Sequence, residues 1–431
     1  MKIVAEWRVY ALGAILWVAL TICSRNFGDR GGPYFMASLT LAGVAYLFAN
    51  REFFTTPRFP RRMVILGLIL AAVWQLEFLR IPSAAGEDIH RYVWDGRLQR
   101  LGYNPYVVVP SDPAVKGLHT SETRNMSSPD LPSPYPPGAQ LFFRGVTSIR
   151  ESTFAMRTAF VICDFAIAFV LLDMLRLNRQ GGHLVLAYAW NPLLALEVAG
   201  SGHIDILGAL LLLVSLAALG RRWRTTAAVG LGLAISIKLL PVVLLPLYWK
   251  RIRIRDAALA AIVVGLLYMP FLRHGHLSTG SLGTYVQSFR FNGPVFAMLD
   301  HVAPPRLLAG LAVLVGLVIA TWIRGAAPEW SAEVVAWPMA ASLLFSPVVF
   351  PWYLLWLVPF VTSASTMLIF VWTVSIIPTY IMWHLRTLGR PWGPLPGWVM
   401  LLEYGSMALV AAILALRRGI SRPKMLSRST E

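Results

Sequence analysis

The sequence predicts an all-α, polytopic integral membrane protein with about 12 to 14 transmembrane helices. Of its 431 residues, 57% are hydrophobic and only 14% are charged, whereas a soluble chain carries about 25% charged residues. Its mean hydropathy is +0.61. Apolar runs of about 18 or more residues, the length that crosses a bilayer, recur from end to end.

The first predicted span, 10–24, follows two basic residues, as the apolar core of a secretion signal does. No small-residue cleavage site follows it, so we interpret it as a transmembrane helix. A hairpin of two shorter helices, broken around Lys238–Pro241, is predicted between Arg224 and Lys250. The remaining spans are predicted at 34–49, 63–81, 154–175, 183–200, 204–220, 256–272, 306–323, 333–348, 349–363, 366–383 and 398–416.

The net charge of +17 is distributed in short basic clusters between the apolar runs. Such clusters mark the cytoplasmic side, where anionic lipid neutralises them, so the charge does not indicate nucleic-acid binding. Placing the cluster 51–62 inside puts every later cluster inside as well. The predicted order is N-terminal transmembrane helices (1–81), an outer-face catalytic loop with surface helices (82–153), a transmembrane bundle (154–416) and a basic cytoplasmic tail (417–431).

The outer loop is the one long polar stretch of the sequence and contains the first candidate site. From Asp88 onward the pattern predicts a helix along the membrane surface, with Tyr92 and Asp95 on the same face as Asp88. A carboxylate at the mouth of a membrane cavity can act as a general base on a hydroxyl. Two alternatives stay open: Asp88 caps the helix, and Asp95 forms a surface ion pair with Arg91.

Two turn signals rich in tyrosine and proline follow this helix. They are Leu101–Tyr106, which contains Asn104, and Ser133–Pro137, which contains Tyr135. Their recurrence after an acidic helix indicates a folded loop that lines a site.

A glycine-rich turn, Gly200–Asp205, is predicted at the outer surface after Glu197 and presents His203 and Asp205 toward the outer loop. Ionisable groups at membrane depth are functional by default. The alternatives are a helix cap for Asp205 and a satisfied turn residue for His203. The two side chains also suggest metal ligands, but no clear third and fourth ligand accompanies them.

Lys238 lies in an otherwise apolar hairpin, where an anion such as a lipid-linked phosphate would stabilise its charge. The alternative is that its side chain extends to the membrane interface. Trp352 and Tyr353 offer aromatic surface for a sugar ring or an isoprenoid, although an interfacial aromatic belt explains them equally well.

Taken in order, these segments resemble the polyprenyl-phosphate-sugar-dependent glycosyltransferases of the GT-C superfamily, in particular the bacterial mannosyltransferases. The segments that carry the resemblance are Glu87–Gly96, Gly102–Tyr106, Tyr135–Pro137, Gly202–Asp205 and Lys238–Pro241. One departure is Val107–Pro110, which is apolar where relatives often have a basic residue, and this shifts donor-phosphate binding toward Lys238 and His203.

The resemblance implies an inverting membrane glycosyltransferase that moves a hexose, expected to be mannose, from a polyprenyl-phosphate donor to a lipid or glycan acceptor. Its active site would face the periplasm or cell exterior, in a monomer that needs no metal or other cofactor. Asp88 would be the base, and Lys238, His203 and Arg91 would hold the donor phosphate. The implied substrate-binding residues are Glu87, Tyr92, Asp95, Asn104, Tyr106, Tyr135, Glu197, Asp205, Trp352 and Tyr353.

The main alternative is a transporter or flippase of a lipid-linked saccharide. Such a protein is expected to contain inverted repeats with broken helices in matching halves. The sequence has one broken hairpin and no apparent second copy of it, which favours the transferase.

Overall fold

The computed structural model describes residues 2–272, 279–326 and 331–420, so most of the predicted basic tail lies outside the described residues. Every regular element in this part of the chain is helical, and two isolated β-bridges join Glu87 to Met126 and Phe291 to Val348. The predicted all-α class is therefore confirmed.

The longer helices form the body of the protein. They are α1 (Lys2–Arg25), α2 (Pro33–Thr55), α3 (Arg61–Leu79), α4 (Asp88–Arg100), α5 (Pro137–Ile149), α6 (Thr153–Leu177), α8 (Asp205–Gly220), α9 (Arg224–Ile237), α11 (Ile254–Tyr268), α14 (Pro305–Ala326), α15 (Ala332–Leu344), α16 (Met367–Ser375) and α18 (Gly397–Ile420). Shorter elements connect them: η1 (Phe27–Asp29), η2 (Pro113–Leu118), η3 (Gly182–Leu184), α7 (Val185–Ala189), η4 (Leu194–Gly200), η5 (Leu240–Leu244), α10 (Leu245–Tyr248), η6 (Met269–Phe271), α12 (Leu282–Ser288), α13 (Pro294–Leu299), η7 (Pro351–Trp356), η8 (Val358–Phe360), η9 (Ala364–Thr366), η10 (Ile377–Tyr380) and α17 (Ile381–Thr387).

Among the described residues, seven helices are long and apolar enough to cross a membrane, and η4 with α8, bent by 113°, forms an eighth candidate. The protein is thus a multi-pass membrane protein. The number is lower than predicted because several predicted spans are broken. The segment 349–363 consists of short 3-10 turns that begin near Pro351, and 183–200 is interrupted at Pro192 before the π-helical η4. Proline removes a backbone donor and interrupts a helix in this way.

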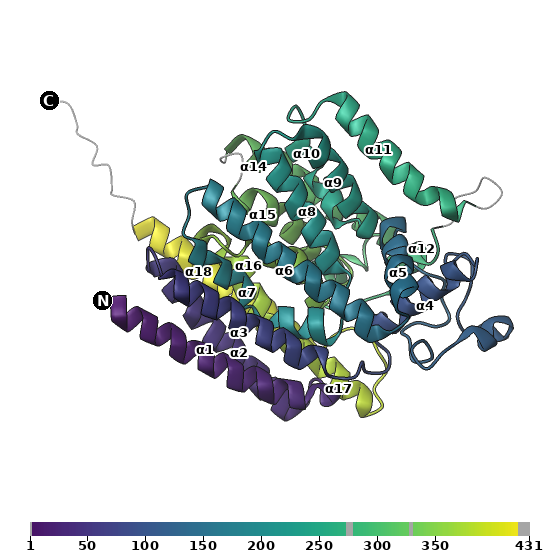
Figure 1. Cartoon of the computed structure of the whole chain (residues 1–431), viewed down its shortest axis with the longest axis horizontal. Coiled ribbons are helices and arrows are strands. Elements are labelled where there is room, and N and C mark those ends of the chain that lie inside the picture. The colour runs from purple at the N-terminus through teal and green to yellow at the C-terminus, as the bar shows by residue number, and fades with distance from the viewer. Residues whose placement is uncertain (1, 273–278, 327–330, 421–431) are drawn as a thin grey trace.

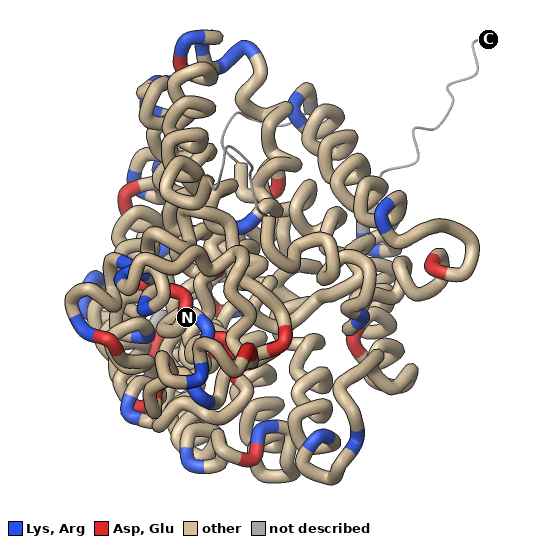
Figure 2. The backbone as a smooth tube through the Cα atoms, turned by 90° about the vertical axis from the view of Figure 1, so that its right-hand side faces the viewer, with Lys and Arg blue, Asp and Glu red and all other residues tan. Residues whose placement is uncertain are grey.

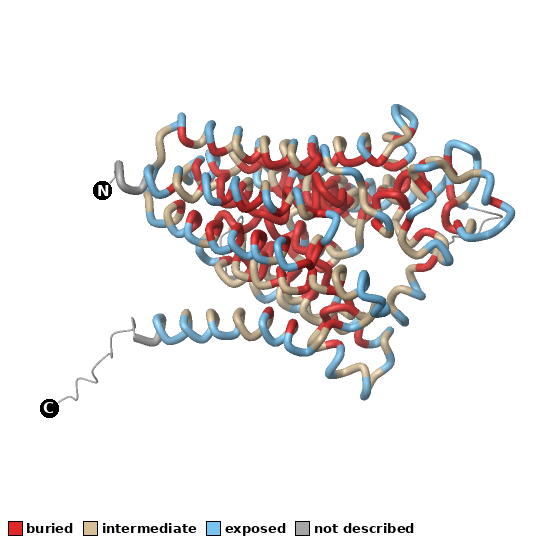
Figure 3. The backbone as a smooth tube through the Cα atoms, turned by 90° about the horizontal axis from the view of Figure 1, so that it is seen from below, coloured by how far each residue is buried: buried red, intermediate tan, exposed pale blue. Residues whose placement is uncertain are grey.

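The helices pack side by side into one bundle, with the segment 82–153, called the outer loop after its predicted side, at one end (Figure 1). The start of α1 and the end of α18 lie at the opposite end from α4 and α5. Charged residues are sparse along the chain and lie mainly in loops and at helix ends (Figure 2). Large apolar side chains are exposed on the outward faces of α1, α3, α11, α14 and α18, where lipid would cover them. The helix α18 is exposed along most of its length (Figure 3).

The helix predicted to begin at Asp88 is present, and it is packed against other elements of the protein. Ten of the 13 residues of α4 are buried, because α5 and α6 pack against it and the segment between α4 and α5 covers another side. The residues of the turn 200–204 are also buried. The hairpin prediction is confirmed in outline: α9 ends at Ile237, and Lys238 starts an irregular turn before η5.

Candidate functional site

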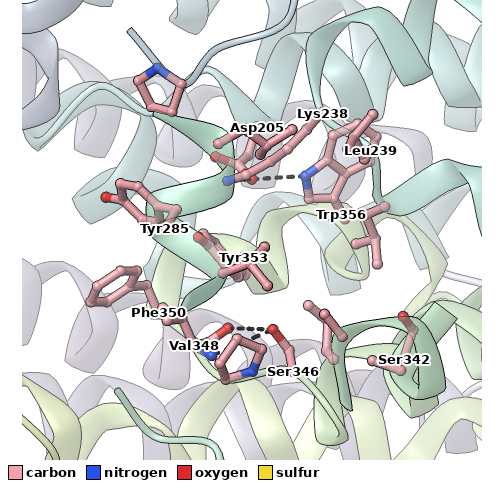
Figure 4. Close-up of a pocket in the computed structure, with 18 of the residues that line it drawn as sticks. Asp205, Lys238, Leu239, Tyr285, Ser342, Ser346, Val348, Phe350, Tyr353 and Trp356 are labelled. Carbon is pink, nitrogen blue, oxygen red and sulfur yellow. Dashed lines mark hydrogen bonds and ion pairs between the residues drawn. The ribbon is translucent and has the colours of Figure 1, made fainter. Parts of the chain in front are cut away.

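A cavity of about 300 Å³ lies between the start of α4, the start of α8, the turn after α9, and the helices α12, α14 and α15 (Figure 4). It brings together side chains from distant parts of the sequence. Seven residues singled out from the sequence line it, namely Asp88, Tyr92, Tyr135, Asp205, Lys238, Trp352 and Tyr353.

Asp88 is the first residue of α4 and lies at the wall of the cavity. The helix cap is Glu87, not Asp88, and the Asp88 carboxylate instead accepts a hydrogen bond of 2.6 Å from Ser127 Oγ. None of the ion pairs in the described part of the chain involves Asp88. Its carboxylate therefore keeps lone pairs available to accept a proton from a bound hydroxyl.

Lys238 and Asp205 form the charged part of the cavity wall. Lys238 Nζ lies 2.7 Å from Asp205 Oδ1 and 3.8 Å from the centre of the Tyr353 ring. The indole N–H of Trp356 donates to the same Asp205 oxygen at 2.8 Å, as Figure 4 shows. The other oxygen, Asp205 Oδ2, is buried and has no hydrogen-bond partner within the described structure. An ammonium has three donors, so Lys238 can bind an anion while it keeps Asp205.

Aromatic rings form the neighbouring wall. Trp352 stacks on Phe350 at 4.3 Å on one side and on His203 at 4.0 Å on the other. Trp352, Tyr353 and Phe350 all line the cavity, whereas His203 lies behind Trp352. Flat rings of this kind suit a sugar face or an isoprenoid chain.

Two buried tyrosines of the outer loop lie beside Asp88. Burial, with a further contribution from the Asp88 carboxylate, raises the pKa of both Tyr92 and Tyr135 well above its usual value. Both phenols therefore stay protonated near neutral pH and cannot serve as the base. This leaves the carboxylate groups of the cavity for proton transfer.

Asp95 and Arg91 form an ion pair of 2.9 Å, which is one of the two alternatives that the sequence left open for this helix. The pair is buried, however, and does not lie at the surface. Asp95 also accepts hydrogen bonds from Ser133 at 2.5 Å and Gln140 at 2.9 Å. The remaining Arg91 contacts are the carbonyls of Ser128 and Leu131. The network ties α4 to the segment before α5, and neither charged group lines the main cavity.

Behind the aromatic wall lies a second set of buried ionisable side chains. His203 Nε2 lies 3.0 Å from Glu197 Oε2, and the other Glu197 oxygen accepts the hydroxyl of Tyr380. Glu87 is paired with Arg30 in a buried ion pair. The structure thus separates Glu87, Glu197 and His203 from the cavity surface.

Asn104 and Tyr106 hold the outer loop on the bundle. Asn104 Nδ2 donates to the carbonyl of Phe271 at 2.9 Å, and the Tyr106 hydroxyl donates to the carbonyl of Tyr135 at 2.8 Å. Both lie away from the main cavity.

Among the residues at or near the site that were not identified from the sequence, four bear on its chemistry. Tyr285 and Trp356 line the cavity, Ser127 contacts Asp88, and Arg30 pairs with Glu87. Trp356 is the last residue of the aromatic-rich segment that begins at Phe350. The reasoning that selected Trp352 and Tyr353 could therefore have included Trp356 as well. The other three carry no local signal, because their partners lie far away in the sequence.

In the comparison with known proteins, one family model matches this chain. The profile described as "Alpha-(1->6)-mannopyranosyltransferase, N-terminal domain" matches residues 17–251, more than half of the chain, which include Asp88, Asp205 and Lys238. The resemblance to mannosyltransferases is thereby confirmed. No curated protein matches the chain. Among solved structures, ArnT from Cupriavidus metallidurans bound to undecaprenyl phosphate aligns with 83% of this chain at 17% identity and a TM-score of 0.46. The chain covers 64% of that protein, slightly less than two thirds of its length.

Proposed function

The chain belongs to the alpha-(1->6)-mannopyranosyltransferase family, and from this we propose that it transfers mannose from a polyprenyl-phosphate donor to a hydroxyl of a lipid or glycan acceptor on the outer face of the membrane. The observation that carries the proposal is the cavity shared by Asp88 and Lys238. The cavity is lined by a carboxylate that forms no ion pair with any described residue and by a lysine, and a sugar could lie between the two.

The proposed reaction is a single displacement with inversion. The acceptor oxygen attacks the anomeric carbon and forms the new glycosidic bond. The bond from that carbon to the phosphate oxygen breaks, and its electron pair leaves with the polyprenyl phosphate. Asp88 takes the proton of the acceptor hydroxyl. No further reactant is needed, and positioning supplies much of the rate.

Lys238 is the proposed ligand of the donor phosphate, because its ammonium lies in the cavity wall. The free Asp205 Oδ2 is a proposed acceptor for a sugar hydroxyl. Arg91 and His203, which the resemblance also assigned to the phosphate, are better suited to positioning roles. Their contacts are the Asp95 carboxylate, the Glu197 carboxylate and the Trp352 ring.

The lipid chain of the donor has an apolar route into the cavity. Leu239 and Val313 line the cavity, and 47% and 39% of their surfaces are exposed. Ala309 and Ala312 of α14 add small side chains to the same wall. A polyprenyl chain could lie along this side while its phosphate meets Lys238.

The proposal is tested with purified protein in nanodiscs and polyprenyl-phosphate-[³H]mannose as donor. Wild-type protein should form a labelled product with a synthetic octyl mannoside. Asp88→Asn should lower kcat by about 100- to 10,000-fold, the usual contribution of a general base, while the thermal unfolding temperature stays within experimental error. Wild-type turnover by Asp88→Asn would remove Asp88 from this role. Movement of the donor across a bilayer without a new glycosidic bond would instead support a flippase.

A further inference from the structure

We propose that the outer loop carries an anion site, separate from the main cavity, that binds a phosphate group on the acceptor. The proposal deepens the proposed function and rests on it, because it assigns a chemical class to the acceptor. The site is a hollow of about 280 Å³ beside α4, lined by Ser111, Lys116, His119, Arg124, Met126 and Pro129 among others. It lies in the part of the chain that projects beyond the end of the bundle (Figure 1).

Two cations converge on this hollow. Lys116 and Arg124 both line it, and both side chains are exposed. Of the salt bridges found among the described residues, none involves either cation, although three acidic residues occur in the same segment. Two cations with no acidic partner form a local positive field that attracts an anion.

The walls of the hollow are fixed by packing. The His119 ring stacks on the buried Trp94 of α4 at 4.0 Å and 7°, and His119 Nε2 lies 2.9 Å from the carbonyl of Pro110. A small apolar cluster formed by Trp94, Leu98, Val115 and Met126 lies beneath it. The segment that carries the two cations is therefore held against α4 by packing.

One wall of the hollow is continuous with the support of Asp88. The segment 124–129 contributes Arg124, Met126 and Pro129 to the hollow. The same segment forms the β-bridge from Met126 to Glu87, and its Ser127 hydroxyl donates to Asp88. A ligand bound in the hollow thus contacts the segment that holds the proposed base.

The chemistry of the hollow favours a phosphate ester over a neutral sugar. The volume is close to the lower end of the roughly 300–1,000 Å³ range of small-molecule pockets. The guanidinium of Arg124 can bind two phosphate oxygens in parallel, and Lys116 adds a point charge. The Ser111 side chain adds a hydroxyl at the rim.

The test compares two probes that differ by one phosphodiester group: octyl mannoside and the same mannoside with that group in its aglycone. Their binding to the full-length protein in neutral-lipid nanodiscs is measured by calorimetry, and KM and kcat by transfer from the labelled donor. For wild-type protein, the charged probe should bind about fivefold to tenfold more tightly, since exposed charge pairs contribute modestly. Lys116→Gln/Arg124→Gln should abolish the difference and leave kcat for the neutral probe unchanged.

A matched control removes two other exposed cations of the outer segment. Arg144→Gln/Arg150→Gln changes the net charge equally on and just after α5, away from the hollow. This control should keep the preference for the charged probe. Equal wild-type affinity for the two probes, or a preference that survives Lys116→Gln/Arg124→Gln, would overturn the anion site.

Two further experiments show whether the bound phosphate belongs to the acceptor or to a lipid headgroup. Inorganic phosphate should compete with the charged probe alone. If anionic phospholipid in the nanodiscs instead raises binding of both probes equally through Lys116 and Arg124, the ligand is a lipid headgroup and the acceptor assignment is wrong. Preferential binding of the charged probe without any transfer would refute the proposed function and leave the anion site standing.

Discussion

Lys238 Nζ and Asp205 Oδ1 lie 2.7 Å apart, and the Asp205 side chain is only 1% exposed while that of Lys238 is 25% exposed. The carboxylate is therefore desolvated, whereas part of the Lys238 side chain remains exposed where it lines the cavity. Loss of the lysine would leave a buried negative charge beside the proposed phosphate position. The pair thus links the stability of the bundle to binding of the donor.

Lys238→Gln is expected to raise the KM for the donor by about 10- to 100-fold, because a hydrogen bond to a charged group contributes about 1.5–3 kcal/mol. The same change is expected to lower the unfolding free energy by about 3 kcal/mol, since Asp205 loses its counter-charge. Donor titrations and thermal unfolding in detergent measure the two effects separately.

Combining Lys238→Gln with Asp205→Asn should restore most of the stability but not the affinity for the donor. Lys250→Gln, which changes an exposed lysine of the same hairpin, should alter neither quantity. A double variant with normal donor KM would show that Lys238 acts only as a structural partner of Asp205.

Asp95→Asn is expected to destabilise the protein by about 3–5 kcal/mol, because it breaks a buried ion pair and leaves Arg91 without its counter-charge. The folded fraction should keep both KM values within about twofold of wild type, since the Asp95 side chain bonds to Ser133 and Gln140 and does not line the main cavity. Unfolding curves and kinetics on the monodisperse fraction provide the comparison with Asp88→Asn. A large rise in the KM for the acceptor with normal stability would show that Asp95 belongs to the substrate-binding site, as the sequence analysis proposed.

Local patterns were sufficient to predict the start of α4 and the break after α9. An acidic residue after Gly86 marks the beginning of a helix, and Pro241 marks the interruption near Lys238. Apolar runs likewise predicted a polytopic bundle. They overestimated the number of spans because a buried apolar run such as 349–363 has the same composition whether it crosses a bilayer or folds into short turns.

The burial of the Arg91–Asp95 pair could not be predicted, because two opposite charges four residues apart on a helix indicate a surface ion pair by default. Arg91 and Asp95 satisfy each other inside the protein, and α5, about forty positions later, covers them. Sequence spacing also gave no indication that Arg30 forms an ion pair with Glu87, or that Tyr285 and Asp88 line the same pocket. Such pairs depend on how distant helices pack, which single-sequence patterns do not record.

Trp352 is expected to contact the sugar of the donor rather than its lipid chain. Trp352→Leu should raise the KM for polyprenyl-phosphate-mannose by about 2- to 12-fold, because the variant loses the ring contacts with Phe350 and His203, of about 0.5–1.5 kcal/mol each, that hold this wall of the cavity in place for the sugar. Trp352→Phe should retain most of the affinity. Binding of polyprenyl phosphate without a sugar should be the same in both variants, and a parallel loss of affinity for that lipid would assign Trp352 to the isoprenoid chain instead.

Arg30 is expected to position Asp88 through Glu87. Glu87 immediately precedes Asp88, and Arg30 joins it to the 200–204 turn by donating to Ser201 Oγ at 2.9 Å. Arg30→Gln should lower kcat by about 100-fold, the usual cost of a misplacement of about 1 Å, and leave the KM for the donor unchanged because Lys238 is unaffected.

Glu87→Asp keeps the charge but shortens the side chain by one methylene group, so its kcat should fall between those of wild type and Arg30→Gln. The double variant Arg30→Gln/Glu87→Gln separates positioning from stability, because it removes the buried unpaired charge. If its unfolding temperature recovers while kcat stays low, the ion pair positions the base. If kcat recovers together with stability, the pair serves only to hold the fold, and the orientation of Asp88 must come from Ser127 and the bridge to Met126.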